Sequence, residues 1–248
     1  MNLLLDLGNS RLKWALDIDG ELQLGSALDW HAPDFDAALR ACWGDLPQPA
    51  RLLGANVTSA ARQQRIEQAL ASHFDQPPQW LRSPATRAGL RNAYTLPQHL
   101  GIDRFLSLLA AHAEGHAPCV IAGCGSALTL DALAPQGRHL GGLIMPGVKA
   151  MQLGLQQAVP GLPTAPGSRS VAWAINTHDA VASGPWQAAA GAIARFQHQL
   201  AAHLGSAPTL LLSGGDAPTL VEVLGSQAQR FDHAVLRGLQ VWARSDSS

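Results

Sequence analysis

The sequence predicts an α/β fold with two similar halves, and three observations support it. Short apolar runs typical of strands alternate with segments of helical period, in the order strand, strand, strand, helix, strand, helix, strand. From Cys119 onward the order strand, glycine-hydroxyl turn, strand, turn, strand repeats the opening of the chain. The 248 residues, 47% of them hydrophobic, are enough for one large or two modest domains, and the repeated order favours two. We therefore expect an N-terminal domain over residues 1–116 and a C-terminal domain over residues 117–248.

The first predicted element is a hairpin at the start of the chain. An apolar run from Leu3 to Leu5 predicts a buried strand, and a second run from Leu12 to Leu16 predicts its partner. Between them lie Gly8 and Asn9, two residues that adopt positive φ at little cost. The sequence thus predicts two antiparallel strands joined by a polar turn.

The tip of this hairpin carries groups that suit a phosphate ligand. Exposed amides, the Ser10 hydroxyl and the Lys13 ammonium could hold a polyphosphate, and the Asp6 carboxylate could hold its Mg²⁺ through water. Lys13 and Lys149 are the chain's two lysines, and a compact ammonium charge is not interchangeable with a guanidinium. The alternative is a hairpin whose turn is polar without a function.

Weaker patterns predict the rest of the first half. After Thr58-Ser59, a helix cap, residues Ile66, Leu70 and Phe74 share one helical face. Residues 83–100 have no sustained period and are read as a loop, and a helix begins at or just before Asp103. The other predicted elements are strands at Glu21–Leu28, Arg51–Val57 and Gln79–Leu81 and a helix at Ala37–Trp43.

The second half carries two further glycine-containing turns. One is the Gly125-Ser126 turn between the first two strands, and the other is Ser213-Gly-Gly-Asp216, whose paired glycines let a flat ring approach the backbone. Gly184-Pro185 is expected to break or kink a long alanine-rich helix. The predicted elements are a strand that opens the segment Cys119–Ser126, further strands at Ala127–Asp131, His139–Met145 and Thr209–Leu212, and helices at Val148–Gln157, Asn176–Leu204, Ala217–Leu224 and Leu239–Arg244.

Composition excludes several classes of function. A net charge of −1 with 14% charged residues argues against a nucleic-acid-binding surface. The longest apolar runs are too short to span a bilayer, and no secretory leader is apparent. Three cysteines without metal-ligand spacing indicate reduced thiols. We expect a cytoplasmic protein with neither nucleic acid nor membrane as a partner.

Several short motifs follow one another along the chain. They are Asp6-Leu-Gly-Asn-Ser10 with Lys13, Tyr94, Gly101-Ile-Asp-Arg104, Gly125-Ser-Ala-Leu-Thr-Leu-Asp131, Gly141-Gly-Leu-Ile-Met-Pro-Gly147 and Asn176-Thr177. Each motif is weak alone, but in this order and at this spacing, from the first residue to the last helix, they resemble those of type III pantothenate kinases, a group that includes the Baf-type accessory proteins.

The resemblance implies a fold and a reaction. The fold would be that of the actin, sugar kinase and Hsp70 superfamily, with two ribonuclease-H-like domains and ATP in the cleft between them. The reaction would transfer the γ-phosphate of ATP to the terminal hydroxyl of pantothenate, the first step of coenzyme A synthesis, in a homodimer. Two alternatives remain: a kinase of the same fold with another acceptor such as a sugar, and a Baf-type regulator that binds nucleotide without turnover.

The resemblance also assigns site residues. Asp103 would be the general base, and Ser126 the second hydroxyl that contacts phosphate. The substrate would be bound by Tyr94, Gly101, Ile102, Asp103, Arg104 and Thr177. The ATP-binding loop would comprise Asp6, Leu7, Gly8, Asn9, Ser10, Arg11, Leu12 and Lys13, with Asp6 also holding Mg²⁺.

One departure concerns a monovalent cation. Many members carry an Asp two residues before the Gly125 position, where it binds K⁺ or NH₄⁺, and this chain has Gly123 there. Carbonyl oxygens could still hold the ion, but the strong anionic ligand is missing. A smaller departure is Ser126 in place of the usual Thr, which keeps the hydroxyl. For Asp131 and Thr177 the alternatives are a turn residue at a strand end and a helix cap.

Overall fold

A computed structural model describes residues 1–163 and 171–245, and the chain forms two compact units. Unit 1 contains Met1–Glu114 together with the C-terminal segment that begins at Ala234, and unit 2 contains Gly115–His233. The first division lies two residues from the expected one. The expected second domain ran to residue 248, whereas the structure groups the last helix with unit 1.

The sheet of unit 1 is built on the N-terminal hairpin. Its strands are ordered β3-β2-β1-β5-β6, and the short β4 pairs with β2 beside β3. Strand β1 is antiparallel to β2 and parallel to β5, which is parallel to β6. The strands are β1 (Asn2–Leu7), β2 (Arg11–Ile18), β3 (Glu21–Leu24), β4 (Leu28–Asp29), β5 (Arg51–Asn56) and β6 (Gln79–Trp80).

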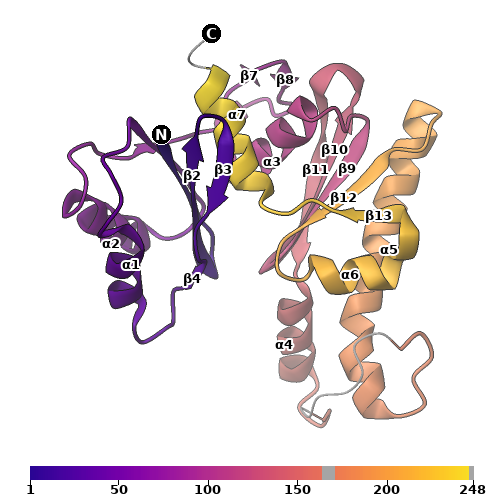
Figure 1. The fold of residues 1–248 in the computed structure, drawn as a ribbon. Coiled ribbons are helices and arrows are strands. Elements are labelled where there is room, and N and C mark those ends of the chain that lie inside the picture. The colour runs from indigo at the N-terminus through magenta and orange to yellow at the C-terminus, as the bar shows by residue number, and fades with distance from the viewer. Residues whose placement is uncertain (164–170, 246–248) are drawn as a thin grey trace. The chain divides into compact units, whose positions relative to one another are not determined.

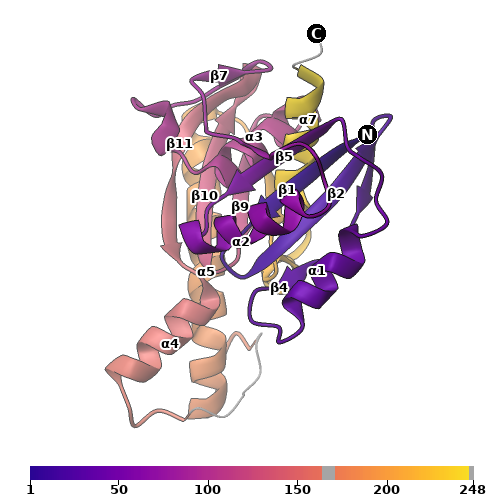
Figure 2. The same cartoon turned by 90° about the vertical axis from the view of Figure 1, so that its left-hand side faces the viewer.

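Helices lie on both faces of this sheet. Figure 2 shows α1 (Phe35–Trp43) and α2 (Ala60–Ala71) in front of it and α7 (Ala234–Ser245) behind it. One face of β1, with Leu3, Leu5 and Leu7, packs in a cluster with Phe35, Trp43 and Ile66. Ser59 caps α2 as predicted, because its Oγ accepts a hydrogen bond from Arg62 N.

Helix α7 packs closely on α3 (Ile102–Ala113), which explains why it belongs to unit 1. A Cβ added at Gly238 would lie 2.1 Å from the carbonyl oxygen of Leu106, so the two backbones nearly touch. Further along α7, Gln240 donates to the Asp17 carboxylate over 2.9 Å and to Gly20 O over 3.1 Å. The helix is longer than the predicted Leu239–Arg244.

The sheet of unit 2 repeats the topology of unit 1. Strand β9 is antiparallel to β10 and parallel to β12, β10 is antiparallel to β11, and β12 is parallel to β13. This is the arrangement of β1, β2, β3, β5 and β6, so the duplication predicted from strand order is confirmed (Figure 1). The strands are β9 (Cys119–Cys124), β10 (Ala127–Ala134), β11 (Arg138–Pro146), β12 (Thr209–Ser213) and β13 (Ala228–Arg230).

The helices of unit 2 are α4 (Val148–Ala158), α5 (Thr177–Leu204) and α6 (Ala217–Leu224). The predicted break at Gly184-Pro185 is absent, and α5 continues through Pro185 as one helix of 28 residues. Pro185 is buried and lies near residues such as Trp186 and Ala189 that join the core of unit 2. Packing of this segment therefore outweighs the one backbone hydrogen bond that proline removes.

The segment from Ser83 to Leu100, expected to be mostly loop, contains three short elements. These are strand β7 (Thr86–Arg87), strand β8 (Leu90–Arg91) and the 3₁₀ turn η1 (Pro97–His99). Strands β7 and β8 form a hairpin with Ala88 and Gly89 at positive φ. The segment leads directly into α3 and the residues of the candidate site.

Candidate active site

The hairpin of β1 and β2 brings the predicted nucleotide loop together as expected. Asp6 and Lys13 are register partners, and Lys13 Nζ lies 3.3 Å from Asp6 Oδ2. Asp6 is only 5% exposed, whereas the Lys13 side chain is 41% exposed and reaches toward solvent. The turn is closed by a hydrogen bond of 3.2 Å from Gly8 N to Arg11 O. A carboxylate and an ammonium are thus held beside a run of backbone amides, a donor set that fits Mg²⁺ and phosphate.

Not every residue of the predicted loop presents its side chain. Leu7 and Leu12 are 0% exposed and belong to the hydrophobic core of unit 1, so they can contact a nucleotide only through their backbone. Asn9, Ser10 and Arg11 are exposed. The loop therefore has buried leucines at its two ends and polar groups at its tip.

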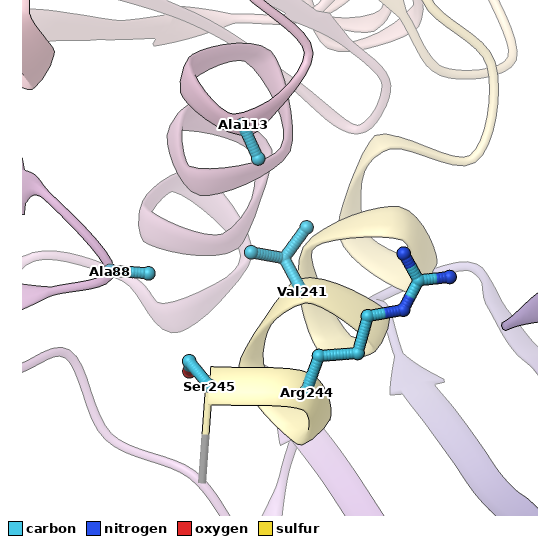
Figure 3. A pocket seen from close by; sticks show the side chains of 5 residues that line it. All are labelled: Ala88, Ala113, Val241, Arg244 and Ser245. Carbon is cyan, nitrogen blue, oxygen red and sulfur yellow. The ribbon is translucent and has the colours of Figure 1, made fainter. Parts of the chain in front are cut away.

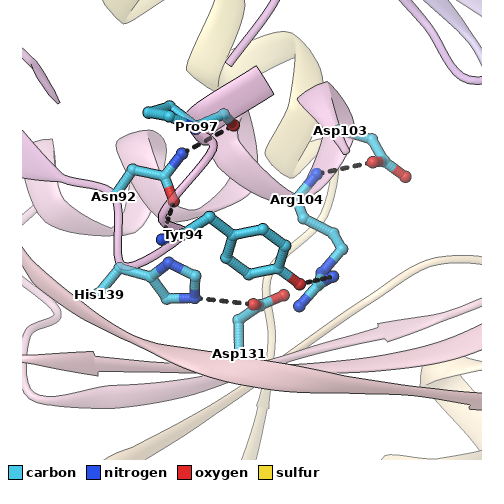
Figure 4. A network of polar contacts seen from close by, with 7 residues as sticks. All are labelled: Asn92, Tyr94, Pro97, Asp103, Arg104, Asp131 and His139. Atoms are coloured by element: carbon cyan, nitrogen blue, oxygen red, sulfur yellow. Dashed lines mark hydrogen bonds and ion pairs between the residues drawn. The ribbon is translucent and has the colours of Figure 1, made fainter. Parts of the chain in front are cut away.

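The predicted substrate residues of unit 1 gather at the start of α3 (Figure 4). Arg104 is 6% exposed, and its Nη1 donates to the Tyr94 hydroxyl over 3.1 Å. Its guanidinium also lies 5.9 Å from the centre of the Tyr94 ring. Ile102 is buried in the core, so only its backbone can face a ligand. Tyr94 and Arg104, ten residues apart in the sequence, are thus brought into contact.

Asp103 lies in the first turn of α3, where free backbone amides favour anions. Its Oδ1 accepts a hydrogen bond of 2.8 Å from Arg104 N. A Cβ added at Gly101 would lie 2.7 Å from the same oxygen, so the glycine leaves room for the carboxylate. A side chain at position 101 would therefore displace the Asp103 carboxylate.

Asn92 is a positioning residue whose contacts sequence reasoning did not identify. Its Nδ2 donates to Pro84 O over 3.1 Å. Figure 4 shows its two other bonds, from Nδ2 to Pro97 O over 3.1 Å and from Tyr94 N to Oδ1 over 3.0 Å. One amide side chain thus fixes both sides of the loop that carries Tyr94. The signal in the sequence was its place two residues before the only tyrosine, a spacing typical of an Asx turn.

In unit 2 three turns lie against one another. Gly147 N donates to Ser126 O over 3.3 Å, and Asp216 N donates to Cys124 O over 3.1 Å. A Cβ at Gly214, where φ is +111°, would lie 2.2 Å from Cys124 O. Ser126 is exposed. Glycine at positions 147 and 214 is therefore needed for the close approach of these turns to the backbone of Cys124, Gly125 and Ser126.

Asp131 does not occupy the strand end that sequence reasoning allowed for it. It lies inside β10 at 3% exposure, and its Oδ1 is 3.0 Å from Nε2 of the buried His139 (Figure 4). His139 had no predicted role. Thr177 is exposed at the first position of α5, and the cap of that helix is Asn176, whose Oδ1 accepts from Asp179 N over 2.9 Å.

A separate hollow of about 310 Å³ lies in unit 1 (Figure 3). It is lined by Ala88, Ala113, Val241, Arg244 and Ser245. None of the predicted site residues lines it, and its only charged group, the Arg244 guanidinium, donates to the carbonyl of Gly20. The hollow therefore adds nothing to the candidate site.

Comparison with known proteins decides the family. A family model described as type III pantothenate kinase matches residues 2–199. A type III pantothenate kinase from Aromatoleum aromaticum is 42% identical over 248 residues, which is 100% of both chains. This chain belongs to the type III pantothenate kinase family. Membership makes it a phosphotransferase and does not favour a Baf-type protein without turnover.

Two solved structures support the fold. A protein described as a Baf family transcriptional activator from Campylobacter jejuni has a TM-score of 0.61 at 22% identity, covering 99% of this chain and 98% of its own. A protein described as a 2-dehydro-3-deoxygalactonokinase from Sinorhizobium meliloti has a TM-score of 0.58 at 16% identity, with coverages of 98% and 96%. The predicted fold class, a duplicated α/β fold that this chain shares with both proteins, is confirmed.

Proposed function

We propose that this chain transfers the γ-phosphate of ATP to the terminal hydroxyl of pantothenate, with Asp103 as the general base. The observation that carries the assignment of residues is the cluster at the start of α3. There, the first-turn carboxylate of Asp103 accepts a hydrogen bond from the backbone N–H of Arg104, and the buried guanidinium of Arg104 donates to the single tyrosine of the chain. An alcohol is a weak nucleophile near pH 7, so a carboxylate that accepts its proton accelerates attack on phosphorus.

Arg104 and Tyr94 would bind the acid end of pantothenate. The guanidinium has five N–H donors in a planar fork that matches a carboxylate, and the Tyr94 hydroxyl constrains its orientation. Gly101 and Ile102 would contribute backbone groups, and Thr177 a hydroxyl from the start of α5. Binding of the carboxylate in this way would hold the hydroxyl at the other end of pantothenate in position to attack the γ-phosphate of ATP.

Residues of both units would hold the nucleotide. The amides of Gly8–Ser10, the Ser10 hydroxyl and Lys13 would contact the phosphates, and Ser126 would supply a second hydroxyl. Asp6 would hold Mg²⁺, which neutralises charge on the phosphates when bound. Phosphoryl transfer depends mainly on positioning and electrostatics. The Lys13 ammonium, 3.3 Å from Asp6 Oδ2, would therefore neutralise negative charge on the phosphates.

The test is a coupled assay of ADP release with and without pantothenate. Asp103→Asn keeps an oxygen for the bond from Arg104 N but removes the base, so kcat should fall by about 10²–10⁴-fold while ATP binding persists. Asp36→Asn is the matched control, because Asp36 is also a first-turn carboxylate. Full activity of Asp103→Asn would exclude the base, and acceptor-independent binding of ATP without ADP release would favour the regulatory alternative. Turnover with a sugar but not pantothenate would identify a different kinase.

We further propose that the active form is a homodimer that covers apolar residues of unit 2. Leu143 and Ile144 of β11 are 49% and 66% exposed, and Leu153 of α4 is 50% exposed. The large apolar residues of α3, by contrast, are already buried in the chain itself. Light scattering after size exclusion should give twice the chain mass for the wild type and a smaller value for Ile144→Asp. A monomeric wild type would refute the dimer.

Dependence on K⁺ or NH₄⁺ should be weak. At Gly123 a Cβ would lie 2.5 Å from Thr129 Oγ1, so the hydroxyl occupies the space where an Asp side chain would begin. Among the residues that the structure describes, no cluster of three His, Cys, Asp or Glu side chains could hold a metal ion. Turnover in sodium, potassium and ammonium buffers measures the dependence, and activation by potassium alone would show that carbonyl oxygens suffice.

We also propose that the protein works in a reducing compartment, the cytoplasm. All three cysteines are free thiols. Within the described part of the chain, no helix is both long and apolar enough to cross a membrane. Fractionation of cells that express the protein, with an immunoblot of the soluble and membrane fractions, tests the location.

A further inference from the structure

The carbonyl groups of the nucleotide loop are held by residues far away in the sequence. Trp30 Nε1 donates to Gly8 O over 2.7 Å, and Arg62 Nη1 donates to Asn9 O over 2.7 Å. The backbone N–H of Trp30 donates to Ser10 O over 3.4 Å. Three consecutive carbonyls of the turn are thus bound by two residues, one before α1 and one in the first turn of α2.

These bonds set the direction of the amides on the same peptide units. In a planar trans peptide the carbonyl and the next N–H point in opposite directions. A bond from Trp30 to Gly8 O therefore turns the N–H of Asn9 away from Trp30. The bond from Arg62 to Asn9 O turns the N–H of Ser10 away from Arg62 in the same way. A carbonyl oxygen facing a phosphate would repel it, so this direction matters for an anion.

The two donors are themselves rigidly placed. Trp30 is 6% exposed and stacks on Phe35, with ring centres 5.0 Å apart. The Arg62 guanidinium lies 5.2 Å from the centre of the Trp30 ring, and its Nη1 also donates to Thr58 Oγ1 over 3.1 Å. Neither side chain has to be ordered when a ligand arrives, which lowers the entropic cost of a bound loop.

We propose that Trp30 and Arg62 are positioning residues for the nucleotide loop, acting through the carbonyls of Gly8 and Asn9. This role rests on the proposed function, in which the loop amides contact the phosphates of ATP. Loss of either donor leaves the turn in place but frees its peptides to rotate. The effect should appear in nucleotide affinity rather than in binding of the acceptor.

The test compares two variants with matched controls. Trp30→Phe keeps an aromatic ring against Phe35 but removes the N–H that Gly8 O accepts. Its control is Trp43→Phe, because Trp43 is in the same hydrophobic cluster and its buried Nε1 makes no hydrogen bond. Arg62→Met removes the donor to Asn9 O. Its control is Arg65→Met, because Arg65 lies one turn later on α2 and binds Asp36 and the Phe35 ring instead of the loop.

Isothermal titration calorimetry with Mg-ATP gives Kd, and the coupled assay gives KM for ATP and for pantothenate. Trp30→Phe and Arg62→Met should each raise the Kd and KM for ATP about 3- to 10-fold, the effect of one lost hydrogen bond. KM for pantothenate should be unchanged, and both controls should match the wild type. Thermal unfolding separates a loss of fold from a loss of affinity, and the half-exposed Arg62 offers the variant less disruptive to the core.

The outcomes distinguish this role from the function on which it rests. Unchanged ATP affinity in Trp30→Phe and Arg62→Met, with an active wild type, overturns the positioning role alone. An equal rise in all four variants also overturns it, because the effect would then be general destabilisation. A wild type that binds Mg-ATP but does not phosphorylate pantothenate overturns the proposed function, while the affinity comparison still decides the role of the two residues. A wild type that does not bind Mg-ATP overturns both.

Discussion

Gly147 is the position where the smallest change should displace the turn that carries Ser126. Its N–H donates to Ser126 O over 3.3 Å. An added Cβ would lie 2.1 Å from Gly125 O and 2.7 Å from Ser126 O, whereas real Cβ contacts essentially never fall below 3.0 Å. The obstructing atoms are backbone, which cannot rotate away as a side chain would. Gly147→Ala must therefore push the two turns apart by about 1 Å.

Two magnitudes follow from this displacement. Overpacking of a well-packed contact costs about 1–3 kcal/mol of unfolding free energy. If the Ser126 hydroxyl positions a phosphate, a shift of about 1 Å should lower kcat/KM for ATP about 10²-fold. KM for pantothenate should change little, because Tyr94, Arg104 and Thr177 all lie outside the two turns that Gly147→Ala pushes apart.

The matched control is Gly154→Ala in α4, seven residues later. No atom lies within 4 Å of a Cβ added there. Alanine inside a helix should stabilise it by about 0.5–1 kcal/mol and leave turnover unaltered. The coupled assay and thermal unfolding of both variants measure these effects. Wild-type kcat/KM for ATP in Gly147→Ala would show that the position of Ser126 does not matter for the reaction.

Two further predictions concern Tyr94 and the cysteines. Tyr94→Phe removes the hydroxyl that accepts a hydrogen bond from the buried Arg104 guanidinium. A hydrogen bond to a charged group contributes about 1.5–3 kcal/mol, so KM for pantothenate should rise about 10-fold or more. Steady-state kinetics should show this rise with KM for ATP unaltered. Burial raises the pKa of Cys119 and of Cys124 from 9.0 to about 12. Below pH 9 each thiol is protonated in the folded and in the unfolded chain. Between pH 9 and 12 it ionises only in the unfolded chain, which favours unfolding. Each cysteine therefore lowers the free energy of unfolding by about 1.4 kcal/mol per pH unit as pH rises through this range. Urea unfolding across this window should show a shallower loss in Cys119→Ala than in the wild type, and equal slopes would contradict the reasoning.

The elements that sequence reasoning predicted well are those encoded by local patterns. The N-terminal hairpin follows from two apolar runs and a turn, and the helix after Ser59 follows from its cap and an apolar face. The duplicated topology was visible as a repeated order of strands. Local signals predict such elements because nearest neighbours in the chain determine them.

The errors arise where packing outweighs local preference. Helix α7 belongs to unit 1 because Gly238 lets it approach α3, a contact between residues more than a hundred positions apart. Pro185 stays inside α5 because its neighbours are part of a core. Asp131 is buried against His139, and the sequence contains no pattern that joins a mid-strand carboxylate to a histidine in the next strand. Each of these outcomes depends on partners that only the folded chain brings together.

The two equivalent turns of the duplicated fold are held in different ways. This difference explains why the sequence marks the residues that fix one turn and not those that fix the other. The turn between β9 and β10 is fixed by close backbone approach, which requires glycine at positions 147 and 214, and such glycines appear in the sequence as recognisable motifs. The turn between β1 and β2 is fixed by side-chain donors 22 and 53 residues away, at Trp30 and Arg62, which no local motif marks. The first turn should therefore be sensitive to loss of a remote donor, and the second to gain of a single methyl group. Equal sensitivity of ATP affinity to Arg62→Met and Arg65→Met, or to Gly147→Ala and Gly154→Ala, would contradict that division.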